Sequence, residues 1–262
     1  METVGVNVTH DASFCRCVNG EIDMFLEEER LSRKKHDNMP VKTVMELQES
    51  NFAGVTGLEY HDYSLRDTCN FFDVIFRKKI PDHDYRTYNQ HHYLHACCGF
   101  YNSGFEEADV VVVDGLGNFF DEEHHECATR WHIKKPAEIK LLERQGASRF
   151  GTKTDRHGYW PMGVGMAYAS ISDYLGFGQL GSGKVMGLAP YGKEDPNIKP
   201  FVIDGRVNSK LFYRTKYSAN FIPYDYLPEE VNIKDQRFMN LAYRLQKDFE
   251  KWMTDFILKC KS

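Results

Sequence analysis

The sequence lacks the features that would place it in a membrane, outside the cell or on nucleic acid. No apolar stretch approaches the roughly 20 residues that a membrane-spanning helix needs, and no signal-peptide core precedes the first patterned strand region. The 33 basic and 38 acidic residues are well mixed and give a net charge of −5. Electrostatics therefore gives no reason to expect nucleic-acid binding, and we expect a cytoplasmic protein without a membrane anchor.

Cysteine usage also excludes a disulfide framework. The seven cysteines are odd in number, and none forms a Cys-x-x-Cys pair, which is typical of a reduced protein with ordinary buried thiols. Hydrophobic residues make up 42% of the 262 residues. That share is enough to bury a core and excludes an intrinsically disordered chain, so we expect one large domain or two small ones.

Extended segments dominate the N-terminal region. Residues 4–8 alternate as in a strand, and residues 12–18 and 21–26 are joined by Asn19-Gly20, a pair that favours a tight hairpin because both turn positions need positive φ. Pro40 predicts the start of a short helix that runs through Ser50. The sheet is therefore expected to begin with an antiparallel hairpin.

The rest of the chain mixes helices and strands, which predicts an α/β protein. We expect helices at residues 91–101, closed by Gly104, at 163–175, capped by Gly176, and at 238–257, with an apolar stripe. Valines 110–113 predict a strand buried on both faces, and residues 129–133 and 139–144 predict two further strands. The segment 181–192 is interpreted as a glycine-rich loop.

Two histidines and a carboxylate form a candidate metal site. His91 and His95 are four residues apart on a predicted helix, so both imidazoles project from one face. Asp114 follows the valine strand, and such a set suits a first-row transition metal. The alternative is a surface helix that carries scattered histidines.

Several segments could meet a phosphate. The turn Asp114-Gly115-Leu116-Gly117-Asn118 permits close approach of backbone amides, although an ordinary turn explains it nearly as well. Residues 178–184 imitate a P-loop, but Val185 stands where a magnesium-binding hydroxyl is required. Lys184 can still meet an anion there. The charged run 121–126 is interpreted as a solvated connection between strands.

Four motifs, in this order and spacing, identify a resemblance. They are His10-Asp11-Ala12-Ser13; Glu28-Glu29-Arg30-Leu31-Ser32-Arg33 followed by Lys35-His36-Asp37; His91-His92-Tyr93-Leu94-His95 followed by Asp114-Gly115-Leu116-Gly117; and Gly165-Met166-Ala167-Tyr168 followed by Gly183-Lys184-Val185-Met186-Gly187. Together they resemble the nodulation and antibiotic O-carbamoyltransferases, whose N-terminal domain is related to the tRNA threonylcarbamoyltransferases. The resemblance covers roughly residues 4–193.

The resemblance implies a reaction and its cofactors. A carbamoyl group from carbamoyl phosphate is activated with ATP as carbamoyl-adenylate and is passed to the hydroxyl of a small-molecule acceptor. A divalent metal, with iron as the first expectation, is held by His91, His95 and Asp114. His10 and Lys35 are the implied catalytic residues. The implied carbamoyl-adenylate contacts are Asp11, Lys35, Gly115, Gly117, Asn118, Gly165 and Lys184.

The resemblance also implies an actin–hexokinase-like fold with ribonuclease H-like halves. The first half is expected at residues 1 to about 150, and residues 151–262 would begin the second. Further polypeptide is then needed, as an adenylate-forming C-terminal domain, a separate subunit or a homo-oligomer that completes the cleft. Two alternatives remain: a non-catalytic nucleotide-binding member of the fold, and a sugar kinase, which has no need for the histidine pair.

Overall fold

The computed structural model describes residues 2–7, 11–38, 40–46, 54–59, 91–148, 154–214 and 219–259. Contacts divide the chain into Met1–Leu94 and His95–Ser262, so the boundary lies within the first turn of helix α4 (His91–Tyr101). Both units mix strands with helices, which confirms the α/β class. The division lies earlier than residue 150, and the assignment of two ribonuclease H-like halves stays a prediction.

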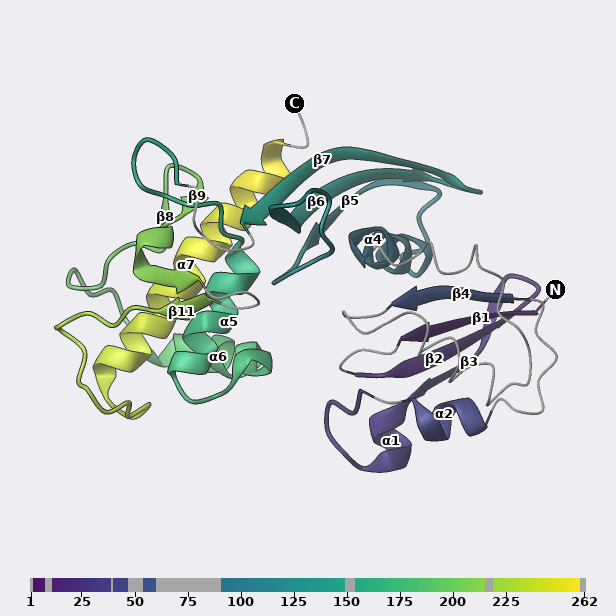
Figure 1. Cartoon of the computed structure of the whole chain (residues 1–262), viewed down its shortest axis with the longest axis horizontal. Coiled ribbons are helices and arrows are strands. Elements are labelled where there is room, and N and C mark those ends of the chain that lie inside the picture. Colours follow the sequence, from purple (N-terminus) through teal and green to yellow (C-terminus); the bar gives the residue numbers. More distant parts are fainter. Residues whose placement is uncertain are drawn as a thin grey trace. The chain divides into compact units, whose positions relative to one another are not determined.

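The first unit is built on a four-stranded sheet (Figure 1). Strands β1 (Glu2–Asn7), β2 (Ser13–Val18) and β3 (Glu21–Glu27) form an antiparallel meander, and β4 (Gly54–Glu59) pairs with β1 in parallel. The β2–β3 turn has φ of 53° at Asn19 and 90° at Gly20, which confirms the predicted hairpin.

Two short helices follow the meander. Helix α1 spans Glu28–Ser32, and α2 spans Val41–Met45, so the helix predicted to begin at Pro40 ends at Met45; residues 47–50 lie outside the described ranges. The Glu28 carboxylate is buried and accepts hydrogen bonds from the backbone N–H groups of Lys42, at 3.1 Å, and Thr43, at 2.8 Å. A buried side chain therefore satisfies the donors at the start of α2.

The second unit contains the antiparallel sheet β5 (Glu107–Val113), β6 (His124–Lys134) and β7 (Glu138–Ser148), in that order. Helix α4 was predicted with these bounds, and Gly104 closes it with φ of 79°. The predicted burial of valines 110–113 on both faces holds only in part: Val112 is buried, whereas Val111 and Val113 are half-buried against the core of the second unit. Among the described strands β5 lies at the edge of its sheet.

The predicted solvated connection at residues 121–126 is also partly wrong. Strand β6 already begins at His124, and His125 and Glu126 are buried. Pairing with β7 explains this extension, because His124 to Glu126 lie opposite Ser148 to Gly146. The strands predicted at 129–133 and 139–144 are confirmed as parts of β6 and β7.

A helical layer follows the sheet. Helix α5 (Val164–Tyr174) and the positive φ of Gly176 are as predicted. The segment 181–192 is not a loop: it holds α6 (Ser182–Leu188) between the 3-10 turns η2 (Gln179–Gly181) and η3 (Ala189–Tyr191). Val185 and Ala189, four residues apart, are buried in the core. Their burial stabilises helical structure despite the glycines.

Short strands connect these helices to the long helix α7 (Gln236–Leu258). They are β8 (Val202–Ile203), β9 (Arg206–Val207), β10 (Phe212–Arg214) and β11 (Ala219–Phe221), with the turn η4 (Ser209–Leu211) before β10. Figure 1 shows α7, in yellow, beside α5. Most of the predicted apolar stripe is buried, whereas Met253 is half-buried and Ile257 is 43% exposed; the buried members are Phe238, Leu241, Leu245, Phe249, Trp252 and Phe256.

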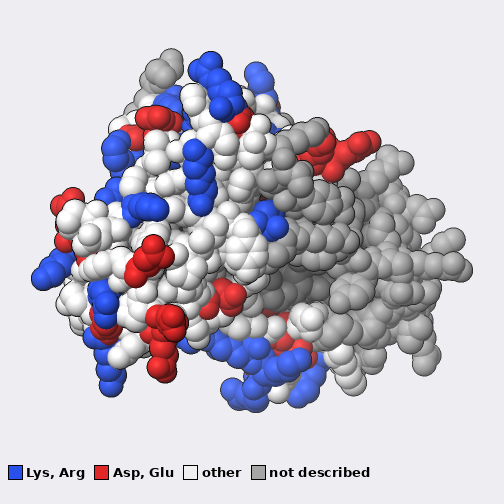
Figure 2. Space-filling model, turned by 60° about the vertical axis from the view of Figure 1, so that its left-hand side comes forward, with Lys and Arg blue, Asp and Glu red and all other residues white. Residues whose placement is uncertain are grey.

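Charges of both signs are interspersed over the face shown in Figure 2. This agrees with the mixed basic and acidic residues of the sequence. Among the described residues, no helix has the length and apolar character to cross a bilayer.

Candidate functional site

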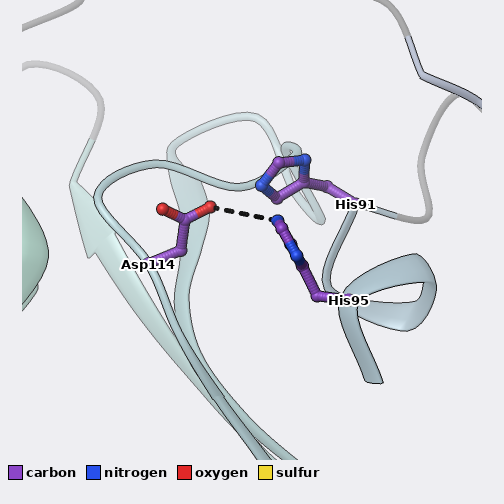
Figure 3. A group of neighbouring side chains, drawn as sticks. All are labelled: His91, His95 and Asp114. Carbon is purple, nitrogen blue, oxygen red and sulfur yellow. Dashed lines mark ion pairs between the residues drawn. The ribbon is translucent and has the colours of Figure 1, made fainter. Parts of the chain in front are cut away.

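The predicted metal ligands come together where β5 ends. Asp114 follows Val113 at the carboxyl end of β5, and His91 and His95 lie one helical turn apart on α4 (Figure 3). Helix α4 packs against β5, with Gly99 next to Val110. One ligand atom of each of the three side chains lies within 4.8 Å of the other two. The three side chains are therefore neighbours, as the helix spacing predicted, and metal binding stays a prediction.

This geometry fits a metal ion. His95 Nε2 lies 3.9 Å from Asp114 Oδ2, longer than a hydrogen bond and close to the separation of two ligands that each lie about 2.1 Å from one ion. The side chain of His95 is 52% exposed and that of Asp114 35% exposed, so solvent ions can reach them. His92, between the two histidines, is fully buried and outside the group.

The turn after β5 is held by β6. The Asp114 N–H donates to Cys127 O, at 3.1 Å, and the Gly117 N–H donates to Glu126 O, at 2.8 Å. His125 Nδ1 donates to the Gly117 carbonyl at 3.0 Å. The Gly115 N–H donates to Asp114 Oδ1 at 2.6 Å. A phosphate contact through the Gly115 and Gly117 amides would therefore require both donors to exchange partners.

Gly165 has a packing role next to this turn. A Cβ atom at Gly165 would lie 2.5 Å from the Asp114 carbonyl oxygen and 2.7 Å from the Gly115 nitrogen. Real Cβ atoms do not come so close to backbone, so only glycine lets the first turn of α5 reach the turn that carries Asp114. Asn118 belongs to the same turn, since its carbonyl accepts from Glu126 N–H at 3.0 Å.

The first unit contains a second group of carboxylates and imidazole. His36 Nδ1 donates to Asp11 Oδ1 at 2.7 Å, and His36 N–H donates to Glu29 Oε2 at 3.1 Å. Ligand atoms of these three residues also lie within 4.8 Å of one another. Lys35 is exposed beside His36, whereas His10 lies outside the described residues. The sequence motif therefore folds into a connected cluster around Asp11.

The backbone around Lys184 differs from that of a P-loop. It lies exposed on α6, with its Nζ 5.7 Å from the centre of the Phe177 ring. Gly178, the first glycine of the P-loop-like pattern, has φ of 75° and precedes a 3-10 turn. Lys184 therefore lies in the first turn of a helix that follows a 3-10 turn. An anion contact of Lys184 stays a prediction.

Comparison with protein families matches residues 54–252 to the family described as carbamoyltransferase N-terminus. The chain belongs to this family. The nodulation protein NolNO of Sinorhizobium fredii is 24% identical over 72% of this chain and 28% of its own length. An uncharacterised Synechocystis protein is 25% identical over 77% of this chain and 36% of its own length. The nodulation protein NolO of Bradyrhizobium diazoefficiens is 33% identical over 40% of this chain and 16% of its own length.

This carbamoyltransferase N-terminal domain thus spans about a third of the length of the first two curated relatives it matches. The family match includes His91, His95, Asp114, Gly165 and Lys184. It does not extend to Asp11 or Lys35, which lie before residue 54.

The carbamoyltransferase domain also has a cavity that the sequence analysis missed. It has a volume of about 420 Å³ and is lined by side chains from β6, α7 and the segment before α5, including Cys127, Trp160 and Trp252. The segments that line this cavity lie far apart in the sequence. Apart from their glycines and apolar residues, they share no signal that predicts them as neighbours. Burial raises the pKa of the Cys127 thiol to about 12, so this cysteine is not a thiolate nucleophile at neutral pH.

Proposed function

We propose that this domain carries the transfer step of an ATP-dependent O-carbamoyltransferase. The donor is carbamoyl-adenylate, made from carbamoyl phosphate and ATP, and the acceptor is a hydroxyl group of a small molecule. The observation that carries the proposal is the family match together with two imidazoles and a carboxylate grouped at the end of β5. A sugar kinase uses magnesium and carboxylates and has no need for this histidine pair.

In the proposed reaction the acceptor oxygen forms a bond to the carbamoyl carbon. The bond between that carbon and the phosphate oxygen breaks, and AMP leaves with the electron pair. His91, His95 and Asp114 would hold a divalent ion, with iron first and zinc or cobalt next, which offsets negative charge on the phosphate. Lys35 adds a second positive charge near the donor. His10 is the proposed acceptor of the hydroxyl proton.

The actin–hexokinase-like fold belongs to the same proposal. Its support is that each unit contains a three-stranded antiparallel meander, β1–β2–β3 and β5–β6–β7. The chain spans about a third of its first relatives, so we propose that an adenylate-forming domain, a separate subunit or a second copy completes the catalytic unit. The proposed location is the cytoplasm.

The first test is nucleotide and metal binding by the chain itself. We expect calorimetry to detect ATP binding that is tighter with Fe²⁺ or Co²⁺ than without, and weakened at least several-fold by Lys35→Ala. Lys140→Ala, a change on β7 away from the motifs, is the matched control. ATP binding that is unchanged by Lys35→Ala would contradict the assignment of Lys35.

The second test separates catalysis from binding alone. Radiolabelled carbamoyl phosphate, ATP and a hydroxyl acceptor are incubated with this chain and with a polypeptide that supplies the adenylate-forming domain. We expect label in the acceptor, at a rate strongly reduced by His95→Ala. Metal and ATP binding without transfer under both conditions would favour a non-catalytic nucleotide-binding member.

A further inference from the structure

Arg214, at the end of β10, is a half-buried cation for which the described residues show no ion pair with a carboxylate. Its Nε donates to the Ser148 carbonyl at 2.9 Å. Both Nη atoms are shielded from solvent, and among the residues that the structure describes neither has a hydrogen-bond partner. Other arginines of the second unit have acidic partners: Arg144 pairs with Glu126, Arg206 with Asp155 and Arg244 with Asp248.

An unpaired guanidinium inside a protein is unfavourable. Removing a charge from water costs free energy unless an opposite charge and hydrogen bonds replace the lost hydration. Desolvation lowers the pKa of Arg214 to about 10, so the group keeps its charge at neutral pH. One N–H of each Nη forms a fork whose geometry matches two oxygens of one oxyanion. Such an anomaly points to a ligand that supplies negative charge.

The position of Arg214 relates it to the candidate metal group. Strands β5 and β7 are both antiparallel to β6, so their carboxyl ends lie at the same edge of the sheet. Asp114 follows the end of β5, and Ser148, the partner of Arg214, ends β7. Two strand spacings amount to about 10 Å. Along the strands Ser148 lies opposite His124 and Val113 opposite Ala128, an offset of four residues or about 13 Å, so an extended ligand such as a nucleotide would be needed to span the metal group and the arginine.

We propose that Arg214 is an oxyanion-binding residue that holds a phosphate group of a ligand on this edge of the β5–β6–β7 sheet. The choice of phosphate over carboxylate rests on the proposed function, in which carbamoyl phosphate and ATP both carry phosphate. The charge and the fork of Arg214 do not depend on that function. The half-buried cation lowers the free energy of unfolding of the chain without ligand, and binding of the anion raises that free energy again.

The experiment measures thermal unfolding of the chain with and without inorganic phosphate. Arg214→Met keeps the length of the side chain and removes the charge, and Arg206→Met removes an arginine that has an acidic partner. Without phosphate, we expect Arg214→Met to raise Tm by about 2–4 °C and Arg206→Met to leave it level or lower it. Millimolar phosphate should raise the Tm of the parent and of Arg206→Met, but not of Arg214→Met.

Titration calorimetry gives the affinity and the source of the phosphate. We expect Arg214→Met to weaken binding of inorganic phosphate roughly 10- to 100-fold. Arg214→Lys, which keeps charge without the fork, should weaken it less and serves if the methionine variant does not fold. The same titrations with ATP and with carbamoyl phosphate identify the source of the phosphate, because the natural ligand should lose more affinity in Arg214→Met. Acetate should bind the parent weakly.

Equal phosphate stabilisation of the parent and both Arg214 variants would overturn the proposal. So would the absence of any effect of phosphate, ATP and carbamoyl phosphate on the parent. Metal content distinguishes this failure from failure of the proposed function, because Arg214→Met should bind as much Co²⁺ as the parent. A chain that binds phosphate through Arg214 but holds no metal would leave the oxyanion site standing and contradict the metal site.

Discussion

Two regions of this chain bring a histidine to a carboxylate near the end of the first strand of an antiparallel meander. In the first unit His36 meets Asp11 at 2.7 Å, and in the second His95 lies 3.9 Å from Asp114. The first separation is a direct hydrogen bond, and a neighbouring carboxylate, Glu29, accepts the His36 N–H. The second separation leaves room for an ion between the two side chains.

Residue types alone therefore do not distinguish a metal site from a hydrogen-bonded cross-link. Both groups offer three ligand atoms within 4.8 Å of one another. The first contains two carboxylates and one imidazole that already bond to each other or to adjacent backbone, so it stabilises the loop at residues 29–37. The second contains two imidazoles from one helix face, which suits a transition metal. We expect metal to bind the second group and not the first.

The largest effect should come from His95→Ala. Removing a direct ligand should weaken Co²⁺ or Fe²⁺ binding at least about 100-fold, more than the loss seen when outer-shell partners are removed. His36→Ala, the matched change in the first group, should leave metal content unchanged. Metal analysis of protein purified without chelator or tag measures both. Equal loss in the two variants would remove the distinction between the groups.

The next effect concerns how each region is held. In the second region backbone packs directly on backbone, so Gly165→Ala should lower the free energy of unfolding by about 2–4 kcal/mol, because its Cβ would meet the Asp114 carbonyl. Gly183→Ala is the control, since its Cβ would meet nothing within 4 Å and alanine favours the helix by up to about 1 kcal/mol. Denaturant unfolding measures both. A tolerated Gly165→Ala would mean that the turn and α5 are not in close contact.

In the first region a side chain has the corresponding role. Glu28→Ala should cost about 2–4 kcal/mol, because two backbone N–H groups at the start of α2 lose their buried acceptor. Glu27→Ala removes a half-exposed carboxylate that pairs with the exposed Arg30, and it should cost no more than about 0.5 kcal/mol. Urea unfolding followed by circular dichroism compares them. Similar costs would show that the buried carboxylate is not what holds α2.

The smallest effect is expected from the Asp11–His36 bond itself. Both side chains are more than a third exposed, so solvent screens the pair and His36→Gln should change the free energy of unfolding by less than about 1 kcal/mol. Thermal unfolding is the measurement. A loss of several kcal/mol would mean that the group is a structural centre rather than a surface cross-link.

Local signals predicted much of this architecture. Asn19-Gly20 predicted the first hairpin. The spacing of the histidines predicted which face of α4 carries them, and the apolar repeat of α7 predicted which of its faces packs in the core. Tertiary contacts decided what failed. Burial of Val185 stabilises a helix in a segment that was predicted as a glycine-rich loop. Pairing with β7 places His125 and Glu126 in a strand, where a loop was predicted. Arg214 carried no sequence signal, because only the fold shows that its Nη atoms are shielded from solvent without a hydrogen-bond partner among the described residues.

Metal binding at Asp114 is tested most directly by a crystal of the chain grown with Co²⁺, with diffraction data collected on both sides of the cobalt absorption edge. We expect an anomalous difference peak within bonding distance of His91, His95 and Asp114, and no peak among Asp11, Glu29 and His36. A peak at the Asp11 group, with none beside Asp114, would show that the metal site is assigned to the wrong group.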